Sequence, residues 1–311
     1  MGDQVSKPTD NDFQGSGLSL LSTVDWKNER HRRSIMASLV KGVYVLEDDR
    51  RKKRQGNLAL APPWWKFFDF QLQEELIDDA GPSIFADSST FGAVYEFKPK
   101  SNNYYPKGAP KYVIAFRGTM LKKDTIIRDT MLNINILINK LSHRSHFDKA
   151  MQPVENIVSG EGVSVRDIWL AGHSLGASIA MLLGRNMAKK GNFIQSYFFN
   201  PPFFATPMKR RIYVASSWFK AALTVIIKDN EERRHSEDLF YGLCKWEPKL
   251  FLHKSDIISA GFILHFEVPE SMENYAVGDV GRLASESSFM RLFMYAFGME
   301  DYSEELHLLP S

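Results

Sequence analysis

The sequence predicts an α/β fold with a mostly parallel central sheet and helices on both faces. Short apolar segments with strand character alternate with helical patterns across the middle of the chain. The 22 Phe and 6 Trp residues supply enough apolar surface for a large core, and no internal repeat divides the 311 residues. Because neighbouring parallel strands need long, usually helical crossovers, this alternation favours one domain with its sheet covered on both sides.

The composition excludes several classes of protein. Lys and Arg total 39 against 37 Asp and Glu, so the net charge of +2 provides no overall field for binding nucleic acid. The single cysteine, Cys244, permits neither an internal disulfide nor a cysteine-rich metal site and fits a reducing compartment. The start has no apolar signal-peptide core, and no run of about 18 apolar residues follows. We therefore expect a cytoplasmic protein without a transmembrane helix.

The first 22 residues are rich in Ser, Gly, Asp and Asn, which predicts a disordered polar tail before a single domain over residues 23–311. Residues 1–6 also match the spacing of an N-myristoylation signal at Gly2, which would attach the chain to a membrane. The acidic Asp3 directly after the glycine argues against that modification.

The first part of the domain is predicted to be helical. From Thr23 to residue 43, apolar residues recur at three- and four-residue steps, with Thr23 or Asp25 as the cap. The charge run at 48–54 is typical of a solvated helix end or loop, with a nuclear-import patch as the alternative. In the aromatic segment 61–68, two prolines argue against a helix and the large rings require burial.

Strands and helices alternate in the rest of the domain. The first two strands are joined by a polar loop of hairpin type, which predicts that they pair with each other. The expected elements are strands at 91–97 and 111–116, a helix at 147–158, a strand at 167–171, a helix at 177–187, and strands at 194–199 and 249–253.

The most specific signal is the G-x-S-x-G pentapeptide Gly172-His173-Ser174-Leu175-Gly176. A serine on a tight strand-to-helix turn needs neighbours without side chains, and an apolar strand before it and a small-residue helix after it supply that context. The first helical N–H, on Leu175, then faces the same point as the Ser174 hydroxyl and can stabilise an oxyanion. A serine in an ordinary packed turn is the alternative.

A second feature supports the first. The apolar strand 113–116 leads into Arg117-Gly118-Thr119, where a Gly-Thr turn can present another backbone N–H. By itself this tripeptide is an ordinary turn. Ahead of the pentapeptide, it occupies the place from which related hydrolases draw their other oxyanion donor, so we expect it to lie beside Ser174.

Three segments resemble the class 3 (fungal-type) lipase group of α/β-hydrolases: Phe-Arg-Gly-Thr at 116–119, Ala-Gly-His-Ser-Leu-Gly-Ala at 171–177 and Phe-Asn-Pro-Pro at 199–202. Residues 61–68 and 306–310 are similar to a plant branch of lipase-like proteins, often labelled GDSL esterase/lipase, although this chain contains no Gly-Asp-Ser-Leu run. The resemblance spans residues 23–311.

The resemblance implies an enzyme with an α/β-hydrolase fold that hydrolyses esters without a metal or organic cofactor. Ser174 would be the nucleophile, and the backbone N–H groups of Thr119 and Leu175 would form the oxyanion hole. The acid and base follow the nucleophile in this architecture. Asp256, which comes after the strand at 249–253, matches the place of the acid and would orient the base histidine. A capping aspartate at a helix start is the alternative.

The base has three alternatives. Only His265 and His307 follow Asp256, and His265 lies within an apolar segment where a helix would bury it. His307 lies near the C-terminus, where the family commonly places its base, but the chain stops at Ser311. Because the plant branch continues to another histidine, this chain could be a shortened version without its base.

Two functions follow from these alternatives. The first is a serine carboxylester hydrolase that cleaves an acyl ester or lipid through an acyl-enzyme intermediate. The second is an α/β-hydrolase scaffold that lacks the base and acts as a binding or regulatory protein. Residues 121–141 have the charged and apolar pattern of an interfacial lid, which would permit contact with a membrane surface; an amphipathic helix packed on the sheet would look the same.

Overall fold

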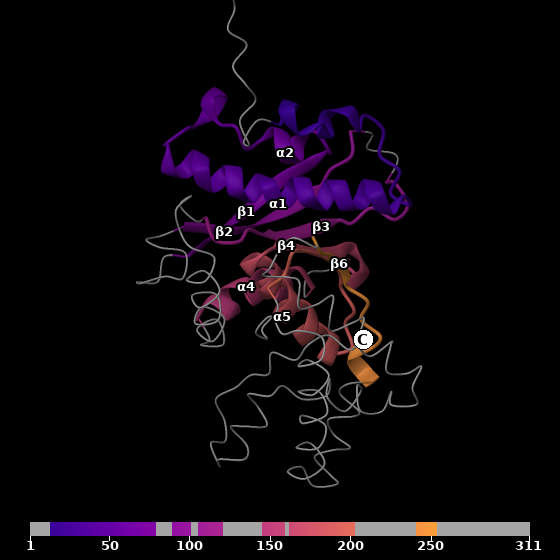
Figure 1. Cartoon of the computed structure of the whole chain (residues 1–311). Coiled ribbons are helices and arrows are strands. Elements are labelled where there is room, and N and C mark those ends of the chain that lie inside the picture. The colour runs from indigo at the N-terminus through magenta and orange to yellow at the C-terminus, as the bar shows by residue number, and fades with distance from the viewer. Residues whose placement is uncertain are drawn as a thin grey trace, which may run out of the picture.

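The computed structural model describes residues 13–78, 89–100, 105–120, 145–158, 162–202 and 241–253, and Figure 1 shows the whole chain. Its elements are 3-10 turns η1 (Gln14–Ser16) and η2 (Leu18–Leu20), α1 (Glu29–Arg51), η3 (Gly56–Leu58), α2 (Pro63–Lys66), β1 (Phe70–Asp78), β2 (Ser89–Phe97), β3 (Tyr112–Phe116), α4 (Ser145–Val158), η4 (Val165–Asp167), β4 (Ile168–His173), α5 (Leu175–Lys189), β5 (Gln195–Phe199) and β6 (Lys249–Phe251).

The six described strands form one mixed sheet in the order β1-β2-β3-β4-β5-β6. The β1, β2 and β3 strands pair antiparallel, whereas β3, β4, β5 and β6 pair parallel. The α/β class and the hairpin pairing of β2 with β3 are confirmed. Strand β1 is an addition that the sequence patterns did not predict.

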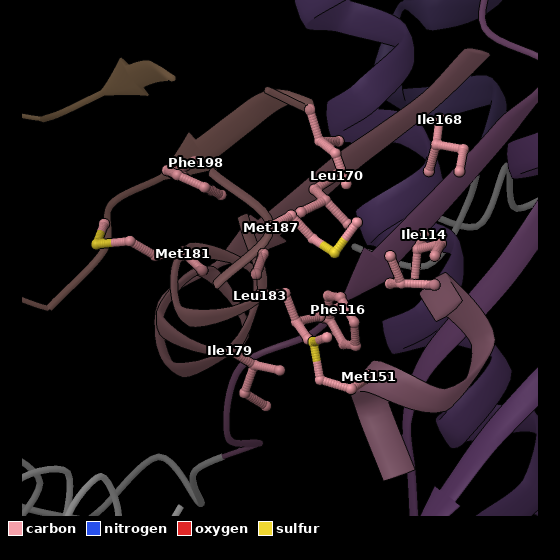
Figure 2. Close-up of a cluster of buried hydrophobic side chains, with 14 of the residues drawn as sticks. Ile114, Phe116, Met151, Ile168, Leu170, Ile179, Met181, Leu183, Met187 and Phe198 are labelled. Atoms are coloured by element: carbon pink, nitrogen blue, oxygen red, sulfur yellow. The ribbon is translucent and has the colours of Figure 1, made fainter. Parts of the chain in front are cut away.

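Helices cover both faces of this sheet, as predicted, with α1 and α2 on one side and α4 and α5 on the other (Figure 1). On the α5 side, alternate strand residues such as Ile114, Phe116 and Leu170 pack with Leu183 and Met187 of α5 (Figure 2). This cluster is built mainly from aliphatic side chains and methionines, which fill the space between α4, α5 and the strands.

The opposite cluster, between α1, α2 and the sheet, is rich in aromatic rings. Trp169 and Tyr197, which point away from α5, pack there with Trp26. Trp65 of α2 contacts Tyr95 of β2 with ring centroids 5.6 Å apart. In the aromatic segment, Trp64, Trp65 and Phe68 are buried as expected, whereas Phe67 is 38% exposed.

Two predictions about the helices were wrong in detail. Helix α1 is capped by Asn28, whose side chain accepts the Arg30 N–H, and not by Thr23 or Asp25. The prolines in the aromatic segment do not exclude a helix, because Pro63 lies in the first turn of α2, where a backbone N–H is not needed.

The charge run at 48–54 is not simply solvated. Asp48 and Asp49 are buried, and both form ion pairs with Arg54. Asp49 also accepts the backbone N–H groups of Leu60 and Ala61, so the acidic half of the run fixes the chain between α1 and α2. The burial is tolerated because these carboxylates are paired and hydrogen-bonded.

The polar N-terminal segment also differs from the expected free tail in the part that the structure describes. Phe13 is 4% exposed and makes an edge contact with Trp64, with ring centroids 5.3 Å apart. The segment from residue 13 onward is therefore anchored on α2.

The carboxyl ends of the parallel strands lie at one edge of the sheet. Phe116 of β3 pairs with Gly172 of β4, and His173 pairs with Phe199 of β5. The segments that follow these strands begin at 117, 174 and 200. Parallel pairing thus places the predicted oxyanion turn and the predicted nucleophile turn beside the Phe-Asn-Pro-Pro segment that follows β5.

Candidate active site

Ser174 lies at the sharp turn between β4 and α5. Its backbone has φ 52° and ψ −125°, a conformation that residues with a side chain rarely adopt. The Ser174 N–H donates to the carbonyl of Phe199, at 2.9 Å, so the turn is fixed to the neighbouring strand β5. Strained backbone held by its surroundings is common at functional sites, and here it belongs to the residue that the sequence singled out.

The two glycines of the pentapeptide allow this turn because neither position has room for a side chain. A Cβ on Gly172 would lie 2.5 Å from the carbonyl oxygen of Gly176. A Cβ on Gly176 would lie 2.5 Å from the carbonyl oxygens of both Phe116 and Arg117 at the end of β3. Close approach between α5 and the ends of β3 and β4 therefore requires glycine at both positions.

Ser174 is also the N-cap residue of α5, and its side chain makes no capping hydrogen bond. Its carbonyl accepts the N–H groups of Ala177 and Ser178. Leu175 is the first helical residue, and the N–H groups of a first helical turn have no partner within the helix. The helix N-terminus at this point carries a partial positive charge that favours a developing anion.

The turn after β3 lies against Ser174, as predicted. A Cβ on Gly118 would be 2.9 Å from the Ser174 Cβ and 2.9 Å from the carbonyl oxygen of His173. Thr119 follows directly, and its Oγ1 is buried with no hydrogen-bond partner among the described residues. The structure therefore brings 118–119 and the Ser174 turn together at the carboxyl edge of the sheet.

Tyr44 of α1 contacts both parts of this site. Its hydroxyl accepts the Gly118 N–H at 2.7 Å and is hydrogen-bonded to His173 Nδ1 at 2.8 Å. Burial raises the pKa of Tyr44 to about 12, although the Gly118 N–H and the charge of Arg117 oppose the rise. The phenol therefore stays protonated at neutral pH.

Arg117 is a buried cation behind the same turn and is 1% exposed. Its guanidinium donates to the carbonyls of Thr90 and Gly118, each at 2.6 Å. Burial lowers the pKa of Arg117 to about 10, and the negative charge of Glu47 opposes that change, so the group remains charged at neutral pH. A full positive charge thus lies two residues before Thr119, the proposed oxyanion donor.

Asn200 directly follows β5, as Ser174 directly follows β4. Its φ of 44° is one that asparagine tolerates better than most residues. The Asn200 N–H donates to Phe251 at 2.8 Å, and its Oδ1 accepts the His253 N–H at 2.9 Å. Asn200 therefore fixes the end of β6 and the following His253, which lies three residues before Asp256 in the sequence.

Comparison with known proteins was made against family models and against individual proteins. No family model matches the chain. A protein from Arabidopsis thaliana named GDSL esterase/lipase is 37% identical over 320 residues, which cover 96% of this chain and 87% of the relative. This chain belongs to the GDSL esterase/lipase family.

Several expected features of this esterase/lipase lie outside the described residues. These are the acid Asp256, the histidines His265 and His307, the segment 121–141 and the N-terminal Gly2. Within the described ranges, no group of three or more His, Cys, Asp or Glu side chains could hold a metal ion. The described helices include none that is long and apolar enough to cross a membrane.

Sequence patterns did not identify Tyr44, Arg117 or Asn200 as site residues of the esterase/lipase. A signal for Tyr44 existed, because it follows the buried Val40 by one helical turn and therefore continues the apolar stripe of α1. A polar side chain on the buried stripe of a helix needs a partner. Nothing local indicated that the partners of Tyr44 would be Gly118 and His173.

Proposed function

We propose that this family member, a carboxylester hydrolase, cleaves acyl esters with Ser174 as its nucleophile on an α/β-hydrolase fold of the class 3 lipase type. The observation that carries the proposal is the backbone of Ser174, with φ 52° and ψ −125° between β4 and α5. The contact between Ser174 and Gly118 adds support, because a nucleophile needs oxyanion donors within about 3 Å of the reacting carbonyl.

In the proposed mechanism, the Ser174 Oγ attacks the ester carbonyl while a histidine removes its proton. The N–H groups of Thr119 and Leu175 stabilise the oxyanion of the tetrahedral intermediate. The histidine then protonates the leaving alcohol, and water attacks the acyl-enzyme by the same steps. Asp256 would orient this histidine, with His307 the first candidate for the base and His265 the second.

The substrate is proposed to be an acyl ester with an apolar acyl chain, such as a lipid. Support comes from the sequence of residues 121–141, which directly follow the turn that carries Thr119 and alternate charged with apolar residues. A lid at this position would open at a membrane or micelle surface and cover the site otherwise. The reaction itself requires no metal or organic cofactor, because the triad and the oxyanion hole supply its acid, base and electrophilic groups.

The first test is covalent labelling of the purified protein with a fluorophosphonate probe, alongside turnover of p-nitrophenyl butyrate. We expect labelling and turnover in the wild type and neither in Ser174→Ala. Ser178→Ala is the matched control, because Ser178 is a buried serine in the first turns of the same helix and should keep both signals. Labelling that survives in Ser174→Ala would place the nucleophile elsewhere.

The second test assigns the acid and base with Asp256→Asn, His307→Ala and His265→Ala. Loss of a triad member costs several powers of ten in kcat, about 10⁴-fold for the acid. We expect this loss for Asp256→Asn and His307→Ala, with His265→Ala close to the wild type. If the wild-type protein shows neither labelling nor turnover, the scaffold without a base replaces the hydrolase mechanism.

A further inference from the structure

The Gly118 peptide groups are held by two side chains, one from helix α1 and one from the preceding residue of the same turn. Tyr44 accepts the Gly118 N–H at 2.7 Å, and Arg117 donates to the Gly118 carbonyl at 2.6 Å. Tyr44 reaches this turn from helix α1, across 74 residues of sequence. In surface turns, backbone N–H and C=O groups ordinarily bond to water. Here both groups of Gly118 have a side-chain partner, which fixes the orientation of its peptide groups.

These contacts decide which amide of the turn can serve the reaction. The Gly118 N–H is already used by Tyr44, which removes it as an oxyanion donor. The described chain contains no cis peptide bond, and in a trans peptide the carbonyl and the following N–H point in opposite directions. Because Arg117 holds the Gly118 carbonyl, the next N–H, on Thr119, is directed away from that buried guanidinium.

The same hydroxyl connects this turn to the turn of the nucleophile. Tyr44 is hydrogen-bonded to His173 Nδ1 at 2.8 Å, and the two rings meet edge to face with centroids 5.8 Å apart. A phenol has one proton, so donating it to Nδ1 while accepting the Gly118 N–H gives each proton an acceptor. The burial that keeps the phenol protonated at neutral pH supports this arrangement.

We propose that Tyr44 is a positioning residue that couples the 118–119 turn to the Ser174 turn and thereby aims the Thr119 N–H at the oxyanion. The inference rests on the proposed function, since it assigns a role within the same site. Tyr44 does not touch the reacting atoms in this scheme. It acts through Gly118 and His173, the residues that immediately precede the donor and the nucleophile in the sequence.

The kinetic test compares Tyr44→Phe with Tyr95→Phe. Tyr95 is a suitable control because it is also a buried tyrosine whose hydroxyl contacts α1, where it donates to the Leu39 carbonyl at 3.3 Å. Misplacement of a catalytic group by a fraction of an ångström costs about 10- to 100-fold in rate. We expect Tyr44→Phe to lower kcat by about that factor with KM within about twofold of the wild type, and Tyr95→Phe to change neither. An unchanged kcat, or an equal fall in both variants, would overturn the proposal.

A second measurement does not depend on catalysis. Hydrogen–deuterium exchange by mass spectrometry on a peptide that covers residues 116–120 reports on the Gly118 amide. Loss of the Tyr44 acceptor should speed its exchange by about tenfold, whereas Tyr95→Phe should leave it unchanged. If the wild type fails the fluorophosphonate test, the proposed function fails and exchange still decides whether Tyr44 holds the turn. Unchanged exchange in Tyr44→Phe would refute the positioning role even in an active enzyme.

Discussion

The two faces of the sheet contribute different kinds of residue to the edge at which Ser174 lies. On the α5 face, small and aliphatic residues such as Ala177 and Leu183 pack against the strands, and glycines set the distance between backbones. On the α1 face, aromatic rings fill the interior, and Tyr44 reaches the turn after β3, where the negative charge of Glu47 acts on Arg117. One face holds the nucleophile by steric contact, and the other holds the oxyanion turn by hydrogen bonds.

This difference determines how each half of the site responds to change. A steric contact between backbones leaves no room for an added atom, so substitution there should abolish the site as a whole. Hydrogen bonds and ion pairs can be weakened one at a time, so substitution on the α1 face should produce graded losses. The predictions below test the contrast, beginning with the largest effect.

Gly176→Ala should be the most damaging change on the α5 face. The new Cβ would lie 2.5 Å from two backbone carbonyl oxygens at the end of β3, and backbone cannot rotate away as a side chain can. We expect the free energy of unfolding to fall by about 4 kcal/mol and esterase activity to disappear. Urea unfolding and p-nitrophenyl butyrate turnover measure both. Gly242→Ala is the control and should change stability little, since nothing lies within 4 Å of its added Cβ. If Gly176→Ala were as mild as this control, the steric account would be wrong.

Glu47→Gln should produce the largest graded loss on the α1 face. The carboxylate is fully buried and accepts hydrogen bonds from Arg50, Arg51 and the Thr90 N–H. Glutamine would present an NH₂ group to one of these donors and leave Arg117 without its nearby negative charge. Breaking a buried ion pair from one side costs about 3 kcal/mol, and we expect kcat to fall less than in Gly176→Ala. If Glu47→Gln were as stable as the wild type, the charge of Glu47 would not stabilise buried Arg117.

The pH dependence of stability provides a separate test of Glu47. Burial alone would raise its pKa, but hydrogen bonds from Arg50, Arg51 and Thr90 outweigh it and hold the pKa below its ordinary value. A carboxyl whose pKa is lowered by folding contributes stability that is present above about pH 4.3 and is lost as the pH falls through the folded-state value. The stability gap between wild type and Glu47→Gln should therefore stay constant from pH 7 to 5 and narrow toward pH 3. If the gap widened on acidification, the pKa of Glu47 in the folded protein would not be lowered.

The same contrast explains what could be predicted from the sequence. The Ser174 turn is marked by the pentapeptide and by the strand and helix on either side of it, so local sequence predicted it, although its contacts with Phe116 and Phe199 come from the neighbouring strands. The strands at 111–116, 167–171 and 194–199 were confirmed as β3, β4 and β5 for a similar reason, since buried parallel strands are continuous apolar runs. Local sequence patterns therefore describe the α5 face well.

The α1 face was predicted poorly because its contacts are distant in sequence. Tyr44 meets Gly118 across 74 residues and His173 across 129, and no local pattern encodes either pair. Strand β1 was missed because an irregular register between Leu72 and Glu74 interrupts its alternation, and Glu74 and Glu75 are exposed beside it. Asp256 and His307 stay predictions, because both lie outside the described residues.

Asn200→Ala should give a smaller loss than Glu47→Gln. Alanine cannot accept the His253 N–H and is less tolerant of the φ of 44°, and these two effects together amount to about 2 kcal/mol. Asn200→Gly is the matched variant, because it relieves the backbone and loses only the hydrogen bond. If this contact positions the segment that leads to Asp256, both variants lower kcat with little change in KM. Loss of kcat in the alanine variant alone would assign the effect to backbone strain.

Asn28→Ala should have the smallest effect and locates the role of α1. Asn28 caps the first turn of α1 by accepting the Arg30 N–H at 2.9 Å, whereas Tyr44 lies four turns further along the same helix. Loss of an N-cap costs about 1 kcal/mol, so thermal unfolding should shift slightly to lower temperature. Fraying at that end should leave kcat unchanged, because the helix acts on the site only through its later turns. A fall in kcat as large as that of Tyr44→Phe would mean that α1 supports the oxyanion turn as a whole rigid unit, not through one hydroxyl.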